Sequence, residues 1–401
     1  MSAPAAGDIE IRVRGPRKFA SLDSQGVALV ATVFVALGAA YVAMCVKAAA
    51  TGFAGFLYGD FHALWVSGVL AHDGAPLINY DSVALHARQI ALGVDAQRDN
   101  PFPYPPTFLL LLAPLGALPL GLAFWLFMGG SLAAFVASLA VGRVRDVRWW
   151  AAGLAAPATG IAIISGQSGL LTGALMIGGF RLAAARPILA GVLFGLLTFK
   201  PQLGVLIPVA LVAAGLWRVA AAATLTALAC FVASGLAFGF AVWPAWLQEM
   251  RGYAGGYDVV VNLMPTIDAN FRNTALGASG AVALQGLAAL AVVIVVWRAF
   301  RAGVSEQGLA LVVVGTFLAT PHAFNYDMPM TSAAIAAYLI ARARPGARMP
   351  IYEIVILAAA FVAPFVILAA NGALAPWTFA PGAALFALMA RREAWEAPRQ
   401  P

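Results

Sequence analysis

The sequence predicts an all-α, polytopic integral membrane protein, and three observations support this fold class. Of the 401 residues, 62% are hydrophobic and 10% are charged, whereas soluble domains carry about 25% charged residues. The apolar residues form continuous runs rather than an alternating pattern, which favours helices over a membrane β-barrel. Positive residues flank these runs singly or in small groups. The net charge of +7 therefore indicates membrane flanks rather than nucleic-acid binding.

The apolar runs predict a single membrane domain over residues 1–401, built as a bundle of about twelve transmembrane helices. Several runs are shorter than the roughly 20 residues that a full crossing needs, so eleven or thirteen spans also fit. The expected spans are 26–46, 119–142, 149–164, 168–184, 187–199, 201–216, 219–241, 275–297, 308–320, 328–341, 350–369 and 376–390.

The distribution of basic residues predicts the orientation of the chain. Placing the N-terminal segment 1–25 and the tail 391–401 in the cytoplasm puts 18 of the 24 Lys and Arg on that side. This bias is typical of membrane proteins. The remaining six are expected outside, as are all four histidines. They are Lys47, Arg88, Arg98, Lys200, Arg251 and Arg272, with His62, His72, His86 and His322.

Two long segments are expected on the outer side, residues 47–118 and 242–274. In the first, residues 61–72 and 82–92 have helical periodicity and predict amphipathic helices lying on the membrane surface. Residues 100–106 (NPFPYPP) predict a rigid extended turn, because proline restricts both itself and the residue before it. Residues 107–118 are too short to cross and predict an interfacial or re-entrant helix.

Two charged residues on the outer side stand out chemically. Asp60 follows the first span and could act as a general base toward a hydroxyl. It also precedes an expected helix, so it could cap the helix amides instead, and the two roles are compatible. Lys200 lies between two apolar runs, where an ammonium needs an anionic partner such as a lipid phosphate. Alternatively, its side chain could extend to the head groups.

Further polar side chains gather on the same side. Gln167, in the turn 166–169 (GQSG), could bind sugar hydroxyls, or the segment could be a plain turn. A six-residue stretch suits anion and hydroxyl binding, unless it is an ordinary loop, and it contains His322, Asn325, Tyr326 and Asp327. Arg272 could grip a phosphate with two hydrogen bonds or remain a solvated loop residue.

The spacing of His, Cys, Asp and Glu matches no metal template. Cys45 and Cys230 lie within or at the end of expected spans, so no disulfide or metal framework is readable. The sequence contains no Gly-rich phosphate loop, which argues against nucleotide use. We therefore expect no cofactor and no metal, and the energy for any reaction would come from an activated lipid substrate.

The sequence resembles the polyprenyl-phosphate-sugar-dependent membrane glycosyltransferases of glycosyltransferase family 87. The resemblance covers about residues 55–330 as an ordered set of short motifs. They are 59–65 (GDFHALW), 76–81 (PLINYD), 103–106 with 111–115, Gly166 with Gln167, 191–202, and 322–327. It implies a GT-C-like bundle in a bacterial inner membrane, with a periplasmic site and cytoplasmic termini. The implied reaction moves a hexose, by default mannose, from a polyprenyl-phosphate donor to a hydroxyl of a lipid or glycan acceptor.

The resemblance also implies roles for individual residues. Asp60 becomes the general base of an inverting displacement. The candidates for binding the donor phosphate are Lys200, Arg272 and His322. The candidates for binding the sugar or the acceptor are Tyr104, Gln167, Asn270, Asn325 and Asp327. Asp73, Asp81 and Asp327 remain alternative bases, although Asp81 in the sequence NYD is typical of a turn or helix cap.

Two other functions compete with this one. A transporter or flippase for a lipid-linked sugar would show polar residues at mid-membrane and matching broken helices in two halves. The expected spans carry almost no mid-span charge, and Glu306 and Glu353 lie near their cytoplasmic ends. A non-catalytic scaffold would leave the outer polar cluster without a cause. Besides the donor and acceptor, membrane lipids are the expected partners.

Overall fold

A computed structural model describes residues 20–52, 58–96, 100–142, 146–253, 261–342, 348–370, 373, 376–391 and 395. The expected positive residue Arg98 and most of the segments 1–25 and 391–401 lie outside this described part. Within it the fold is all-α, apart from one short antiparallel pairing between β1 (Ser21–Leu22) and β2 (Met349–Pro350).

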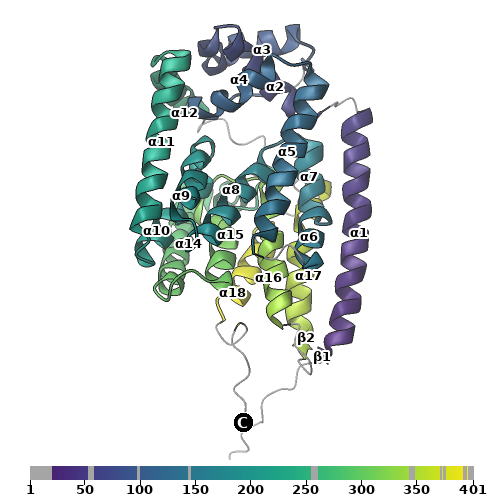
Figure 1. The fold of residues 1–401 in the computed structure, drawn as a ribbon. Helices are drawn as coiled ribbons and strands as arrows, with labels where there is room; N and C mark the ends of the chain where they lie inside the picture. Colours follow the sequence, from purple (N-terminus) through teal and green to yellow (C-terminus); the bar gives the residue numbers. More distant parts are fainter. Residues whose placement is uncertain are drawn as a thin grey trace, which may run out of the picture.

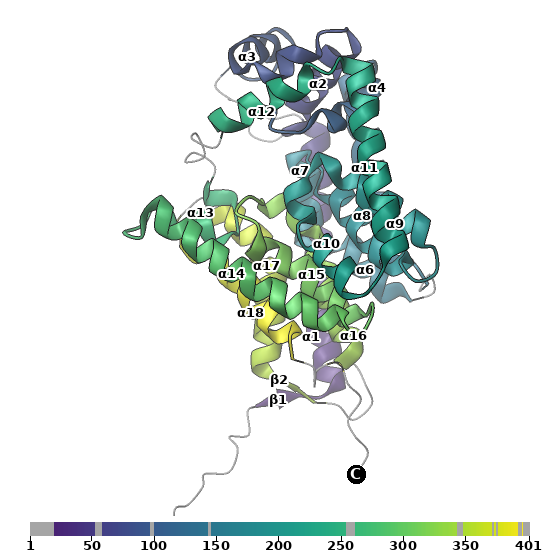
Figure 2. The same cartoon turned by 90° about the vertical axis from the view of Figure 1, so that its left-hand side faces the viewer.

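The helices form a bundle with a layer across one end (Figure 1). Figure 2 shows that this end layer lies opposite the β1–β2 pair. The bundle comprises α1 (Ser24–Thr51), α5 (Leu120–Ala140), α6 (Val147–Leu154), α7 (Pro157–Ser165), α8 (Gly169–Leu182), α9 (Pro187–Leu196), α10 (Leu206–Ala213), α11 (Trp217–Phe238), α14 (Gly277–Phe300), α15 (Glu306–Ala319), α16 (Thr331–Arg342), α17 (Ile351–Ala370) and α18 (Ala380–Met389). The end layer comprises α2 (Phe61–His72), η1 (Pro76–Tyr80), α3 (Ser82–Ala91), η2 (Pro106–Phe108), α4 (Leu109–Gly116) and α12 (Val242–Tyr253).

Five helices are long and apolar enough to cross a membrane: α1, α5, α11, α14 and α17. The pair α6–α7, bent by 43°, makes a sixth if it counts as one span. Every other apolar run also contains a helix, so the positions of the helices were predicted well. These helices are too short to cross alone, and the count of twelve spans stays a prediction. Proline at the first turn of α7 and α9 separates each of them from the preceding segment.

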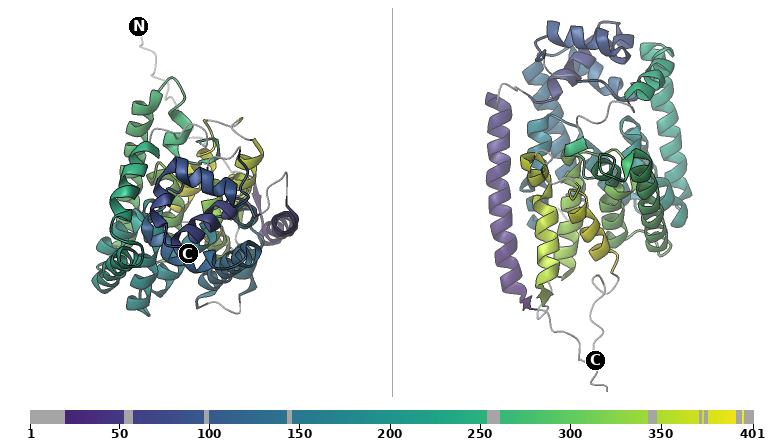
Figure 3. Two further views of the ribbon diagram at one scale, coloured as in Figure 1. Left: turned by 90° about the horizontal axis from the view of Figure 1, so that it is seen from above. Right: turned by 180° about the vertical axis from the view of Figure 1, so that it is seen from behind.

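Two of the short helices, α8 and α15, lie inside the bundle. In α8 and α15 nearly every residue is buried, whereas α1 stands at the edge of the molecule with most side chains exposed (Figure 3). Interrupted helices are compatible with a membrane where other protein segments surround them and satisfy their backbone groups.

In the end layer, α2 and α3 begin and end within one residue of their predicted bounds. The prediction that α2 is amphipathic was wrong, because eight of its twelve residues are buried. It packs closely on α4, where a side chain on Gly68 would collide with the carbonyl oxygen of Leu112. By contrast, α3 is amphipathic, as predicted, and buries Leu85 and Gln89. Helical periodicity alone could not reveal that a second helix covers α2.

The α2–α4 contact leads to a first prediction. Gly68→Ala places a methyl group against backbone that cannot move aside, so we expect a loss of about 1–3 kcal/mol in stability. Gly129→Ala in α5 is the control, because a methyl group there meets nothing within 4 Å. That control should be neutral or stabilising, since alanine favours helices. Thermal unfolding in detergent measures both, and equal midpoints for the two variants would contradict the packing argument.

Candidate functional site

The site forms where the segment before α2 crosses the turn between α7 and α8. Gly59 and Gly166 both have positive φ, 56° and 63°, which favours glycine. A side chain on Gly59 would collide with the carbonyl oxygen of Ile164, and one on Gly166 would strike that of Tyr58. The amide of Asp60 donates to the carbonyl of Ser165 at 2.9 Å. Two glycines therefore let the two backbones touch, and this contact places Asp60 beside Gln167.

The same turn also contacts the segment 320–327. A side chain on Gly169 would collide with the carbonyl oxygen of Tyr326. The turn 166–169 is thus held between the Asp60 segment on one side and the Tyr326–Asp327 segment on the other. The segment 166–169 is therefore more than a plain turn. Gly166 and Gly169 are both needed, because each lies in close contact with the backbone of a neighbouring segment.

The carboxylate of Asp60 does not cap α2. Its backbone is already helical (φ −70°, ψ −13°), and its side chain makes no capping hydrogen bond. Instead, Oδ2 accepts from Nε2 of Gln167 at 3.1 Å. The capping interpretation of Asp60 is therefore wrong. Asp81, by contrast, caps α3 by accepting from the amide of Ala84 at 3.0 Å, as its sequence predicts.

Tyr104 fixes the orientation of Gln167. Its hydroxyl donates to Oε1 of Gln167 at 2.8 Å, and both side chains are buried. Because a carboxylate only accepts, the amide nitrogen must face Asp60 and the amide oxygen must face Tyr104. Tyr104 is itself held by Tyr80, whose hydroxyl donates to the Tyr104 carbonyl at 3.2 Å. The result is a directed chain from Tyr104 through Gln167 to Asp60.

A buried ion pair adjoins this chain. Nζ of Lys200 lies 2.6 Å from Oδ1 of Asp327, with the two side chains only 4% and 3% exposed. Oδ2 of Asp327 accepts from the amide of Phe324 at 3.2 Å. The ammonium also lies 5.7 Å from the ring centre of Tyr104 and 5.0 Å from that of Tyr326. Lys200 is thus a buried residue of the site, and the expectation that it extends to the head groups is wrong.

His322 lies in the same segment as Asp327 and packs edge-on against Phe324, with ring centres 5.1 Å apart. Burial and the nearby charge of Lys200 lower the pKa of His322 from 6.5 to about 3. The imidazole is therefore neutral at pH 7. Of the two roles predicted from sequence, a cation or a hydrogen-bond donor, the structure favours the donor.

The other predicted residues have anchoring partners. Arg272, at the end of α13 (Ile267–Phe271), pairs with Asp268 at 3.0 Å and is largely covered, so it is not a solvated loop arginine. The amide of Asn270 bonds to Thr266 and Thr378 at 2.7 Å each, and thereby ties α13 to the segment before α18. Asn325 donates to the carbonyl of Pro364 in α17 at 3.4 Å. These contacts do not place the three residues in the Asp60–Gln167–Tyr104 chain.

The α13 segment nevertheless adjoins the His322 segment. Thr266 donates to the carbonyl of Pro321 at 3.0 Å, and Met264 and Phe324 belong to one small apolar cluster. Tyr80 was missed as a site residue, although it lies inside a motif that the sequence had already marked. Tyr326 was noted in the polar cluster 322–327, but its contact with Lys200 was not predicted. Among the described residues, no group of three His, Cys, Asp or Glu is close enough to hold a metal ion.

The buried ion pair leads to a second prediction. Lys200→Met and Asp327→Leu each leave one buried charge uncompensated, and each should lower stability by about 3–5 kcal/mol. The double variant removes both charges and should recover most of this loss. Thermal or detergent denaturation measures the three proteins. Strictly additive losses would contradict the pairing.

The lowered pKa of His322 leads to a third prediction. As the pH falls, His322 is protonated in the unfolded chain before it is protonated in the folded protein. The stability that neutral His322 contributes is therefore fully present above pH 6.5 and falls as the pH drops toward 3. Wild-type protein should therefore lose more stability between pH 7 and pH 5 than His322→Gln does. The exposed His72 is the control position, and His72→Gln should behave like wild type. Parallel curves for His322→Gln and wild type would overturn the argument.

Comparison with known proteins bears on what these residues do. The model of glycosyltransferase family 87 matches residues 102–321, more than half of the chain. The matched region contains Tyr104, Gln167, Lys200 and Arg272, whereas Asp60 precedes it. Searches of curated proteins and of solved structures gave no match. With its all-α fold and apolar helices long enough to cross a membrane, the chain belongs to glycosyltransferase family 87 and is a glycosyltransferase.

Proposed function

We propose that the protein transfers a hexose, by default mannose, from a polyprenyl-phosphate donor to a hydroxyl of a lipid or glycan acceptor. The observation that carries this proposal is the chain from Tyr104 through Gln167 to Asp60, adjoining a buried ammonium. A proton acceptor and a cation within one polar cluster are the two groups that such a displacement needs.

Asp60 is the proposed general base. The acceptor oxygen attacks the anomeric carbon while Asp60 takes the hydroxyl proton. The bond from the anomeric carbon to the phosphate oxygen breaks, and its electron pair leaves with polyprenyl phosphate. A single displacement inverts the anomeric carbon, through a transition state resembling an oxocarbenium ion. Gln167 acts as a positioning residue, because it holds Oδ2 of Asp60 while Tyr104 prevents its amide from turning.

The leaving phosphate gains negative charge as the bond breaks. Hydrogen-bond donors that are already oriented toward it stabilise that charge best. Lys200 can share its ammonium between Asp327 and the phosphate, because its three N–H groups point in different directions. His322 offers a neutral N–H. Arg272, on the adjoining α13, would have to share its guanidinium with Asp268. Lys200 and His322 are therefore the first candidates for the phosphate, and Arg272 is the third.

The placement of the reaction follows from charge and fold together. The site lies next to the end layer, whereas α1 begins at the opposite end, beside β1 and β2 (Figure 1). The bias of Lys and Arg puts that opposite end in the cytoplasm. This supports a periplasmic site in a bacterial inner membrane, with short apolar helices completing a GT-C-like bundle of about twelve crossings. No cofactor or metal enters the proposed reaction.

The experiment is sugar transfer in liposomes from polyprenyl-phosphate mannose and a panel of other lipid-linked hexoses, with a membrane lipid extract as acceptor. Asp60→Asn keeps the shape and removes the base, so we expect kcat to fall about 10²- to 10⁴-fold. Asp81→Asn is the matched control, because that carboxylate caps α3 and should leave kcat within a few-fold.

Equal losses in the two variants would remove Asp60 as the base. An active Asp60→Asn would shift the role to another outer carboxylate. A wild-type protein that transfers no hexose, yet moves a lipid-linked sugar across the liposome membrane, would replace the proposal with transport.

A further inference from the structure

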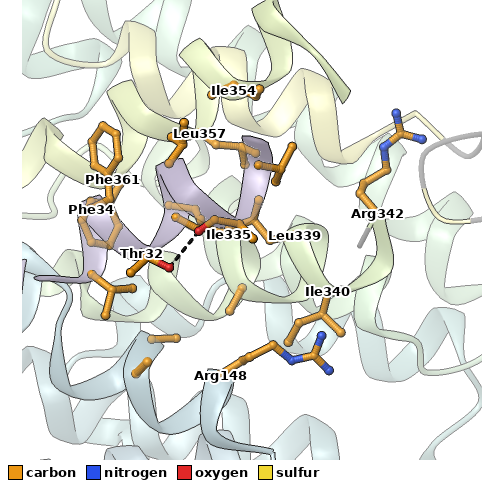
Figure 4. Close-up of a pocket in the computed structure, with 18 of the residues that line it drawn as sticks. Thr32, Phe34, Arg148, Ile335, Leu339, Ile340, Arg342, Ile354, Leu357 and Phe361 are labelled. Carbon is orange, nitrogen blue, oxygen red and sulfur yellow. Dashed lines mark hydrogen bonds between the residues drawn. The ribbon is translucent and has the colours of Figure 1, made fainter. Parts of the chain in front are cut away.

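A separate pocket of about 510 Å³ lies between α1, α6, α16 and α17 (Figure 4). It opens near the β1–β2 end of the bundle, away from the Asp60 site. Its lining is almost entirely apolar and includes Val27, Phe34, Leu339, Leu357 and Phe361. The volume falls within the range of about 300–1,000 Å³ that is typical of ligand-binding sites.

The pocket exists because α1 is attached to the bundle at two separated points. Near its middle, Gly38 lets α1 touch the carbonyl of Ala155, and Phe34 packs edge-on against Phe361 at 5.9 Å. Before its first turn, β1 pairs with β2, and the amide of Ile351 donates to Ala20 at 2.9 Å. Between these attachments α1 runs along the pocket instead of filling it.

Two arginines mark one side of this apolar space. Arg148 of α6 and Arg342 of α16 line the pocket, and Figure 4 shows both at its edge away from Phe34 and Phe361, with Ile340 between them. Arg148 pairs with Asp146 at 2.8 Å, and Arg342 lies 3.4 Å from Glu353. Arg391 also lies beside Glu353, at 3.5 Å. Among the described residues, Arg148 and Arg342 are thus the charged side chains in the lining itself, and both are cationic.

We propose that this pocket binds an anionic phospholipid from the leaflet on that side of the membrane. One acyl chain lies between α1 and α17, and the phosphate lies against Arg148 and Arg342. An apolar cavity gives water few partners, whereas hydrocarbon fills it favourably. Basic pockets between membrane helices on the cytoplasmic side suit anionic head groups. The two cationic side chains of the lining favour an anionic lipid over a zwitterionic one. This proposal does not depend on the chemistry at Asp60.

The test is native mass spectrometry of the full chain in mild detergent, titrated with phosphatidylglycerol, with phosphatidylcholine of the same acyl chains, and with polyprenyl phosphate. Ala31→Phe fills the pocket from α1 and should abolish saturable binding of phosphatidylglycerol. Ala39→Phe is the matched control on an exposed face of the same helix, outside the pocket, and should bind as wild type does.

Charge is tested separately. Arg148→Gln should weaken phosphatidylglycerol binding about fivefold and leave phosphatidylcholine unchanged. Arg148 is preferred to Arg342, whose removal would deprive the buried Glu353 of a partner. Arg218→Gln, an exposed arginine outside the pocket, makes the same change in charge and should have no effect. Equal affinity for the two phospholipids, equal loss in Ala31→Phe and Ala39→Phe, or preferential binding of polyprenyl phosphate in the pocket would each overturn the proposal.

Discussion

The candidate site depends on one steric constraint, the contact between two backbones at Gly59 and Gly166. With any other residue at these positions, the segment before α2 and the α7–α8 turn would be forced apart. Asp60 and Gln167 would then lose their hydrogen bond, although both side chains would still be present. Gly169 sets a similar contact with Tyr326. Three glycines therefore determine the spacing of the proposed base, its positioning amide and the segment of the ion pair.

The electrostatics of the site follow from burial. Burying Lys200 and Asp327 costs both ions their hydration, and their mutual attraction at 2.6 Å, together with the Phe324 amide on Asp327, offsets that cost. The same burial keeps His322 neutral. The incoming lipid phosphate would therefore meet a compact set of oriented donors rather than a region of high positive charge. Such donors need little rearrangement when charge develops on the leaving group.

The sequence predicted the helices closely, because long apolar runs and prolines determine where helices begin and end. It also marked Asp60 as a candidate base and marked Lys200, Gln167 and Asp327 as candidate binding residues. Their partners could not be predicted, because Lys200 and Asp327 are 127 residues apart and Tyr104 and Gln167 are 63 apart. The burial of α2 and the neutral state of His322 depend on neighbours that only the fold supplies. The number of membrane crossings could not be predicted for a related reason, since short buried helices and full spans have similar composition.

Tyr104 takes part in both halves of the site, with its hydroxyl on Gln167 and its ring near Lys200. The proposed base, through Gln167, and the proposed phosphate-binding ammonium therefore both depend on one side chain. A change that adapts one half to a new substrate would disturb the other. New acceptor or donor preferences would then arise more easily through substitutions in the surrounding segments than at Tyr104. We therefore expect this tyrosine and its two contacts to change together or not at all.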